Sequence, residues 1–70
     1  SAYYSKDYIT AKKYFDVVLG LYPMDYNALL MNGWTNYFIG KKTEAKILFN
    51  KVLMVAPTDS SAKEGLALLK

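Results

Sequence analysis

The sequence contains no cysteine, no histidine and no arginine, and glycine and proline are both scarce. Without cysteine the chain has neither a disulfide nor a thiolate metal site, and the cellular compartment stays open. Without histidine it lacks the commonest metal ligand and the commonest general base. Arginine is the usual contact for phosphates and guanine bases, so its absence from a chain of net charge +3 argues against nucleic-acid binding.

The chain also lacks a long apolar run, since none approaches the roughly 18 residues that span a bilayer. Hydrophobic residues nonetheless make up 53% of the chain and charged residues only 21%, which is typical of a globular protein rather than a disordered one. With so few glycines and prolines, such a chain is expected to be mostly helical. We therefore expect one small all-α domain without a membrane span.

Patterns typical of catalysis are missing too. The sequence shows no glycine loop for a phosphate, no metal-ligand spacing and no pair of nucleophile and base. The carboxylates are spread along the chain without a partner that converges on them: Asp7, Asp16, Asp25, Glu44, Asp59 and Glu64. We therefore expect a protein that is not an enzyme and that has no cofactor and no metal.

Turn residues and hydrophobic spacing predict four helices, at residues 7–22, 25–39, 43–55 and 60–69. Asp25 and Asp59 stand where N-caps are needed, and Thr43 can cap the third helix. Gly40 follows the second helix as a left-handed C-terminal cap. The connections are only a few residues long, so neighbouring helices are expected to run antiparallel.

The most informative feature is an internal repeat with a period of 34 residues. Between Ala11 and Ala28, eight of eighteen positions carry the same residue 34 places later, where average usage gives about one match. The matching pairs are Ala11/Ala45, Lys12/Lys46, Phe15/Phe49, Val18/Val52, Leu19/Leu53, Pro23/Pro57, Asp25/Asp59 and Ala28/Ala62. A fixed period in this range is typical of stacked repeat proteins, whose units bury their apolar faces against their neighbours.

The pattern resembles the tetratricopeptide repeat, a 34-residue helix–turn–helix unit with small and aromatic residues at fixed places. The residues that carry the resemblance are Gly33, Gly40, Ala45, Phe49, Val52 and Pro57. Asn32 stands where this family prefers leucine, and Asn36 stands where it prefers tyrosine. The resemblance implies a right-handed α-solenoid of antiparallel helix pairs. In it, Gly33 and Ala45 let two helices cross closely and Phe49 fills the space between units.

In this frame the chain is a single tetratricopeptide domain of about two 34-residue units, arranged as one full repeat and two half repeats. We assign a partial repeat to residues 1–24, a complete repeat to 25–58 and the first helix of the next repeat to 59–70. Arrays of this kind need about three units for stability. The sequence therefore predicts either a piece of a longer solenoid or a chain that forms homo-oligomers through its exposed end helices.

In tetratricopeptide arrays the first helix of each unit lines a concave groove that often holds a peptide. Carried over by position, the resemblance implies partner-binding residues on the second helix, namely Asn27, Leu30, Trp34, Tyr37 and Phe38. Exposed aromatic rings are typical of binding hot spots, although these rings could equally pack on adjacent helices. The inner positions that grip a terminal carboxylate in some arrays carry no cation here, so we expect an apolar or aromatic ligand.

Two functions remain open at this point. The first is a non-catalytic protein–protein interaction scaffold that holds a peptide or a partner segment in the concave groove. The alternative is a structural spacer or self-association segment of a larger repeat protein, with no separate ligand. Most lysines fall on second helices or turns, where they keep a helix surface soluble, so nucleic acid is not expected as a partner. The sequence does not identify the protein partner.

Overall fold

The computed structural model describes residues 5–69 and folds them into four α-helices without a strand. The helices are α1 (Ser5–Leu21), α2 (Tyr26–Ile39), α3 (Lys42–Val55) and α4 (Ser60–Leu68). The prediction of an all-α chain with four helices is confirmed for this range, with boundaries that differ by at most two residues. The ends of the two predicted half repeats, residues 1–4 and 70, lie outside the described residues.

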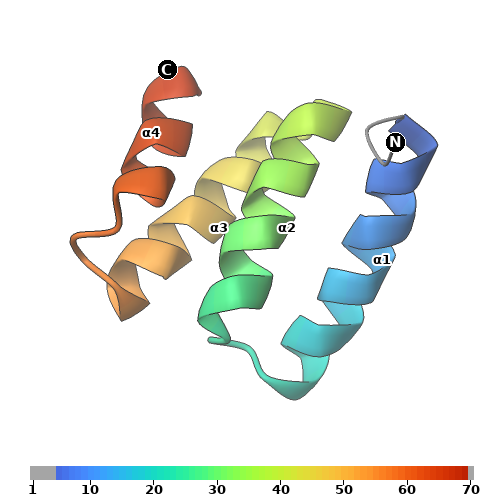
Figure 1. Ribbon diagram of the computed structural model, residues 1–70, viewed down its shortest axis with the longest axis horizontal. Coiled ribbons are helices and arrows are strands. Elements are labelled where there is room, and N and C mark those ends of the chain that lie inside the picture. The colour runs from blue at the N-terminus through green and yellow to red at the C-terminus, as the bar shows by residue number, and fades with distance from the viewer. Residues whose placement is uncertain (1–4, 70) are drawn as a thin grey trace.

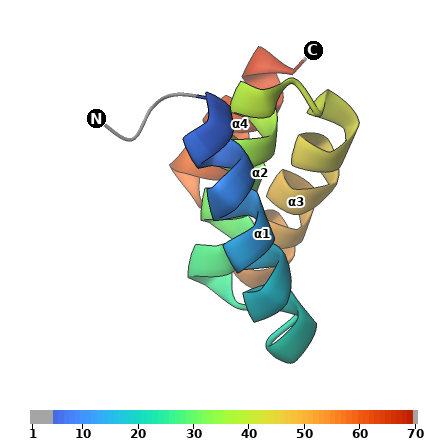
Figure 2. The same ribbon diagram turned by 90° about the vertical axis from the view of Figure 1, so that its right-hand side faces the viewer.

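Consecutive helices run in opposite directions and pack side by side in chain order (Figure 1). α1 packs on α2, α2 on α3 and α3 on α4, and α2 also contacts α4. The view from the α1 side shows α1 in front of α2 and α3 set off to one side (Figure 2). α1 and α3 both pack against α2 but not against each other. α2 is therefore the central helix of the described chain.

The predicted N-caps and the C-terminal glycine cap are confirmed. The Asp25 carboxylate accepts a hydrogen bond from the Ala28 amide at 2.9 Å, and the Asp59 carboxylate accepts one from the Ala62 amide at 2.8 Å. Both aspartates have extended backbone, as a capping residue should. Gly40 ends α2 with a φ of 100°, a left-handed conformation that glycine adopts without steric cost.

The prediction that Thr43 caps the third helix is wrong. α3 begins one residue earlier, at Lys42, and its N-cap residue is Lys41, whose side chain makes no capping hydrogen bond. The cause is the tight closure of α2, in which the amides of Gly40 and Lys41 both donate to the Asn36 carbonyl. The chain is thereby turned so sharply that the next helix starts at once, and Thr43 falls inside its first turn.

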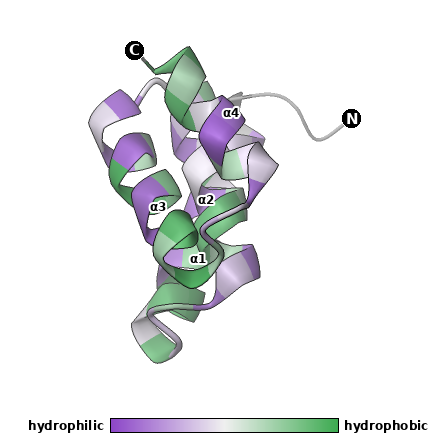
Figure 3. Ribbon diagram, turned by 90° about the vertical axis from the view of Figure 1, so that its left-hand side faces the viewer, coloured by the Kyte–Doolittle hydropathy of each residue, from purple (hydrophilic) through white to green (hydrophobic). Residues whose placement is uncertain are grey.

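The hydrophobic core lies where α2, α3 and α4 meet. α3 is amphipathic, with hydrophilic and hydrophobic residues alternating around its turns (Figure 3). Its inward side chains Ala45, Phe49 and Val52 are fully buried. The Phe49 ring lies between two glycines, and a Cβ atom added to Gly33 of α2 or Gly65 of α4 would lie 2.8 or 2.5 Å from ring atoms. The core thus depends on one large ring and two residues without side chains.

Candidate binding site on the second helix

α2 presents two chemically different faces. Residues three or four positions apart share a face of a helix, so Trp34, Tyr37 and Phe38 lie together on one side. Asn32 and Asn36 lie on the other side, about half a turn away. The helix carries no charged residue between its N-cap aspartate and Lys41. α2 therefore carries aromatic rings on one face and amides on the other.

The first face carries an aromatic cluster, which consists of Tyr8, Trp34, Tyr37 and Phe38. Trp34 meets Tyr37 edge to face with ring centres 5.7 Å apart, and it stacks on Phe38 at 6.1 Å. Tyr37 and Phe38 meet edge to face at 5.3 Å, and Tyr8 of α1 stacks on Phe38 at 5.1 Å. These separations lie in the range of favourable aromatic pairs. The cluster therefore joins the N-terminal half of α1 to the C-terminal half of α2.

Trp34 anchors the aromatic cluster to the core. Its ring centre lies 5.1 Å from that of the buried Phe49, and its indole N–H donates to the Ser61 hydroxyl of α4 at 3.1 Å. Trp34 is only half-buried, whereas Phe38 at the outer edge is 54% exposed. The cluster therefore has a fixed inner ring and an exposed outer ring.

The structure brings together three of the five residues predicted to bind a partner, namely Trp34, Tyr37 and Phe38. Leu30 lies one turn earlier on the same face, is half-buried and packs against the hydrophobic core. Asn27 is exposed in the first turn of α2. The interpretation of the rings as packing fits Trp34, which points inward. The interpretation of the rings as a binding surface fits Phe38, which faces outward.

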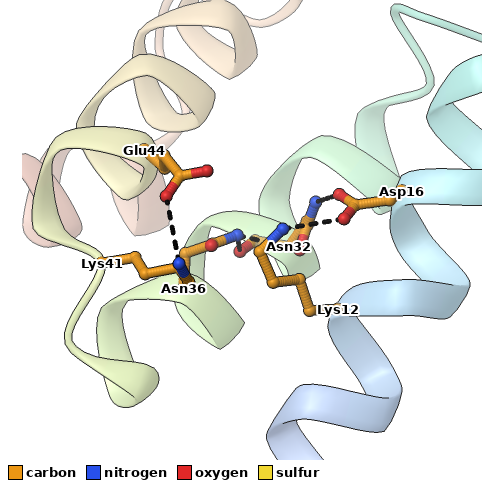
Figure 4. Close-up of polar contacts among 6 residues, drawn as sticks. All are labelled: Lys12, Asp16, Asn32, Asn36, Lys41 and Glu44. Carbon is orange, nitrogen blue, oxygen red and sulfur yellow. Dashed lines mark hydrogen bonds and ion pairs between the residues drawn. The ribbon is translucent and has the colours of Figure 1, made fainter.

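The opposite face carries a row of polar side chains that runs from α1 across α2 (Figure 4). Lys12 donates to one oxygen of the Asp16 carboxylate at 2.8 Å, and the Asn32 side-chain amide donates to the other at 2.9 Å. The Asn36 amide nitrogen donates to the Asn32 backbone carbonyl at 2.8 Å and to its side-chain oxygen at 3.0 Å. Both asparagines are almost completely buried. The row links α1 to α2 through side chains alone.

The ionisation of Asp16 is set by this row. Partial burial opposes the charged form, but the hydrogen bonds from Lys12 and Asn32 outweigh it, and the pKa of Asp16 lies below its ordinary value. Asp16 is therefore charged at neutral pH, with both of its oxygens engaged. A buried amide held by a carboxylate in this way fixes the position of α1 on α2.

No family model matches this chain, and neither a curated protein nor a solved structure matches it significantly.

The polar row was not predicted as a site, although its two asparagines do stand out in the sequence. They occupy positions where the tetratricopeptide pattern has leucine and tyrosine, and they are four residues apart, which places them on one face. The missing information was the contact with Asp16, which belongs to another helix. Two amides in a helix interior at core positions are the signal that could have pointed to a buried polar contact.

No helix in the described residues 5–69 is both long enough and apolar enough to cross a membrane. Within the same range, no three acidic side chains gather closely enough to hold a metal ion.

Proposed function

We propose that this chain is a non-catalytic protein–protein interaction scaffold of the tetratricopeptide type, which holds a peptide or a partner segment against the aromatic cluster. The observation that carries the proposal is the exposed Phe38 ring, which rests on a Trp34 ring that is itself fixed to the core. Binding hot spots combine a large ring with a rigid base, because little side-chain entropy is then lost on binding.

The assignment to a right-handed α-solenoid of antiparallel helix pairs is part of this proposal. Three features support it. The four helices alternate in direction, α2 contacts α4, and the capping aspartates Asp25 and Asp59 repeat 34 positions apart with the same hydrogen bond to the amide three residues later. In a solenoid of this kind α2 and α4 are first helices of successive units and line the groove together.

The ligand is expected to be apolar or aromatic. The groove side of α2 carries no charge, and the Ser61 hydroxyl of α4 is already bonded to the Trp34 indole. Glu64 and Leu68 extend the same side of α4 and are exposed. A peptide that places one aromatic or branched apolar side chain against Phe38 would bury that ring from water.

The test is a peptide selection against the full 70-residue chain, followed by titration of the enriched peptide. Phe38→Ala removes the exposed ring without opening the core, so binding should weaken at least about tenfold while helicity is unchanged. The matched control is Tyr14→Ala, because Tyr14 is also an exposed aromatic residue, 64% accessible on α1, and lies outside the aromatic cluster. This control should bind like the unaltered chain.

Two results would count against the proposal. Enriched peptides could lack apolar side chains altogether, or they could bind the Phe38→Ala and Tyr14→Ala variants equally well. Circular dichroism of both variants confirms that any loss of binding is not a loss of fold.

The alternative function, a structural spacer or self-association segment without a separate ligand, is favoured by a different observation. One face of α1 exposes apolar side chains at helical spacing, namely Tyr14, Val17 and Leu21. Apolar side chains gathered on one helix face are typical of a protein contact surface. If α1 serves this alternative, the stability of the chain should depend on its concentration.

A further inference from the structure

α2 contains the dipeptide Asn32–Gly33, and each of its two residues is fixed by a contact with a different helix. The Asn32 side-chain amide donates to the Asp16 carboxylate of α1 at 2.9 Å, and Asn32 is 1% exposed. Gly33 faces α3, where a Cβ atom at this position would lie 2.8 Å from the Phe49 ring. Packing on α1 thus favours an amide at position 32, and packing on α3 favours glycine at position 33. Together the two contacts place asparagine directly before glycine.

Asparagine followed by glycine is chemically reactive in a flexible chain. The backbone nitrogen of the glycine loses its proton, attacks the side-chain carbonyl carbon of the asparagine and closes a five-membered succinimide ring. The bond from that carbon to the side-chain nitrogen breaks, and the nitrogen takes up a proton and leaves as ammonia. Water then opens the ring at either carbonyl and gives aspartate or isoaspartate, so the chain gains one water and loses one ammonia. Glycine favours the attack because it has no Cβ atom and the widest choice of backbone angles.

The folded structure blocks this reaction at Asn32. Both residues lie in the interior of α2 (Tyr26–Ile39). In an α-helix each backbone N–H donates to the carbonyl four residues earlier, which engages the Gly33 nitrogen and directs it away from the preceding side chain. The Asn32 side chain is held at both ends, since its nitrogen donates to Asp16 and its oxygen accepts from the Asn36 amide at 3.0 Å. The reaction therefore requires that the helix open.

The products do not fit the native packing. An aspartate at position 32 would set a second carboxylate against the Asp16 oxygen that now accepts from the Asn32 amide. Two carboxylates in contact repel each other unless they share a proton. Lys12 bonds the other Asp16 oxygen and is already engaged there. Isoaspartate adds a carbon atom to the main chain, which disturbs the regular hydrogen bonding of the helix.

We propose that Asn32 is a site of spontaneous deamidation, which becomes reactive only when the chain unfolds and whose product destabilises the packing of α1 on α2. Water is the only co-reactant. An episode of unfolding is thereby recorded in the covalent structure of the chain. The inference is independent of the aromatic cluster, because Asn32 and Gly33 face α1 and α3 and take no part in that cluster.

The first test compares the folded with the unfolded chain. The full 70-residue chain is incubated in mildly alkaline buffer with and without guanidinium chloride, and trypsin then releases residues 14–41 as one peptide, because no lysine lies between Lys13 and Lys41. Mass spectrometry of this peptide locates each converted asparagine. Asn32 should convert at least about tenfold more slowly in the folded chain, since the reaction follows the open fraction. Asn27, which is exposed on the same helix and precedes alanine, is the internal control and should convert slowly in both incubations.

The second test measures what the product does to the fold. Asn32→Asp reproduces the aspartate product and should raise the unfolding equilibrium constant at least about tenfold in urea titrations, because a buried charge without a partner is costly. The matched control is Asn50→Asp, an equal change of an exposed asparagine within α3, which should alter that constant by less than about threefold. The double variant Asp16→Asn, Asn32→Asp exchanges donor and acceptor and leaves one charge in the contact. It should regain most of the lost stability.

The proposal is overturned if Asn32 converts as fast in the folded chain as in guanidinium chloride, or if Asn27 converts as fast as Asn32 in the unfolded chain. It is equally overturned if Asn32→Asp is as stable as Asn50→Asp, or if the double variant is no more stable than Asn32→Asp. The incubations use the unaltered chain, so they give a result even if Asn32→Asp does not fold.

Discussion

At the scale of single residues, the packing of Phe49 explains why two glycines sit inside helices. Glycine in a helix interior ordinarily destabilises it by about 0.5–1 kcal/mol relative to alanine. At Gly33 and Gly65, glycine is instead the more stabilising residue, because a Cβ atom at either position would overlap the Phe49 ring. The ring lies between these two glycines and is confined by both helices. Gly20 in α1 has open space around it and gives the ordinary case.

Alanine substitutions should therefore have opposite effects at two helical glycines. Gly65→Ala is expected to lower the free energy of unfolding by about 1–3 kcal/mol, because the trapped ring cannot move away from the added methyl group. Gly20→Ala is expected to raise it by up to about 1 kcal/mol through helix propensity alone. Urea unfolding followed by circular dichroism measures both. Equal stability of the two variants would show that the ring is not confined between the glycines.

At the scale of helices, Asp59 joins the start of α4 to the start of α2. Its carboxylate accepts from the Ala62 amide and from the hydroxyl of Tyr26, the first residue of α2. The Tyr26 hydroxyl, followed by the Ala62 amide, lowers the pKa of Asp59 below its ordinary value, and the same bond raises the pKa of Tyr26. One carboxylate thus caps a helix and ties two helices together.

The lowered pKa of Asp59 predicts a loss of stability in acid. The group is more acidic in the folded chain than in the unfolded one, so its contribution is complete above the unfolded pKa of about 3.9. That contribution disappears as the pH falls through the lower folded pKa. The urea midpoint should be nearly constant from about pH 7 to 5 and should fall below about pH 4.

Asp59→Asn isolates this effect. The variant should be less stable at neutral pH and should show a shallower decline in acid, the remainder coming from Asp16, whose pKa is also lowered. Glu64→Gln, an exposed change of the same charge on α4, should follow the unaltered chain. A decline for Asp59→Asn as steep as that of the unaltered chain would remove Asp59 as the cause.

At the scale of the whole molecule, the helices differ in how well they are covered. α2 lies between α1 and α3 and also contacts α4, so its side chains are the most enclosed. In the described range, the backbone of α1 lies close to α2 and to no other helix, and α1 contributes no fully buried side chain from residue 7 onward. Its exposed apolar side chains Tyr14, Val17 and Leu21 therefore form a surface that another chain could cover.

Self-association through α1 predicts that stability depends on chain concentration. Binding that is confined to the folded state raises the melting temperature by mass action, so the melting temperature should climb over about a hundredfold range of concentration. Sedimentation velocity should show the same transition as an increase in mass. The double variant Tyr14→Lys, Val17→Lys changes two exposed residues and should stay monomeric with a constant melting temperature. Monomeric behaviour of the unaltered chain throughout would contradict the prediction.

The sequence was sufficient for the number, type and order of the helices, because the signals involved are local. Asp25 and Asp59 cap the amides three residues later, and Gly40 takes a left-handed conformation that its own lack of a side chain allows. The start of α3 was misassigned by one residue for a related reason. The hydrogen bonds that close α2 onto the Asn36 carbonyl favour a start of α3 at Lys42, whereas the capping preference of threonine favours Thr43 as the N-cap. Residue preferences alone do not decide between these two starts.

The candidate binding site was predictable only in part. Helical spacing placed Trp34, Tyr37 and Phe38 on one face, but it could not divide them into an anchored ring and an exposed ring. That division comes from Phe49 and Ser61, which belong to other helices.

The polar row and the trapping of the Phe49 ring were decided by the packing of one helix on another. Asp16 and Asn32 are 16 residues apart, and the two glycines around Phe49 lie on different helices. Local preferences act within a turn or two of chain, whereas these contacts exist only after three helices have taken their places. Their geometry is a property of the assembled bundle, because burial removes the water that would otherwise satisfy each polar group separately.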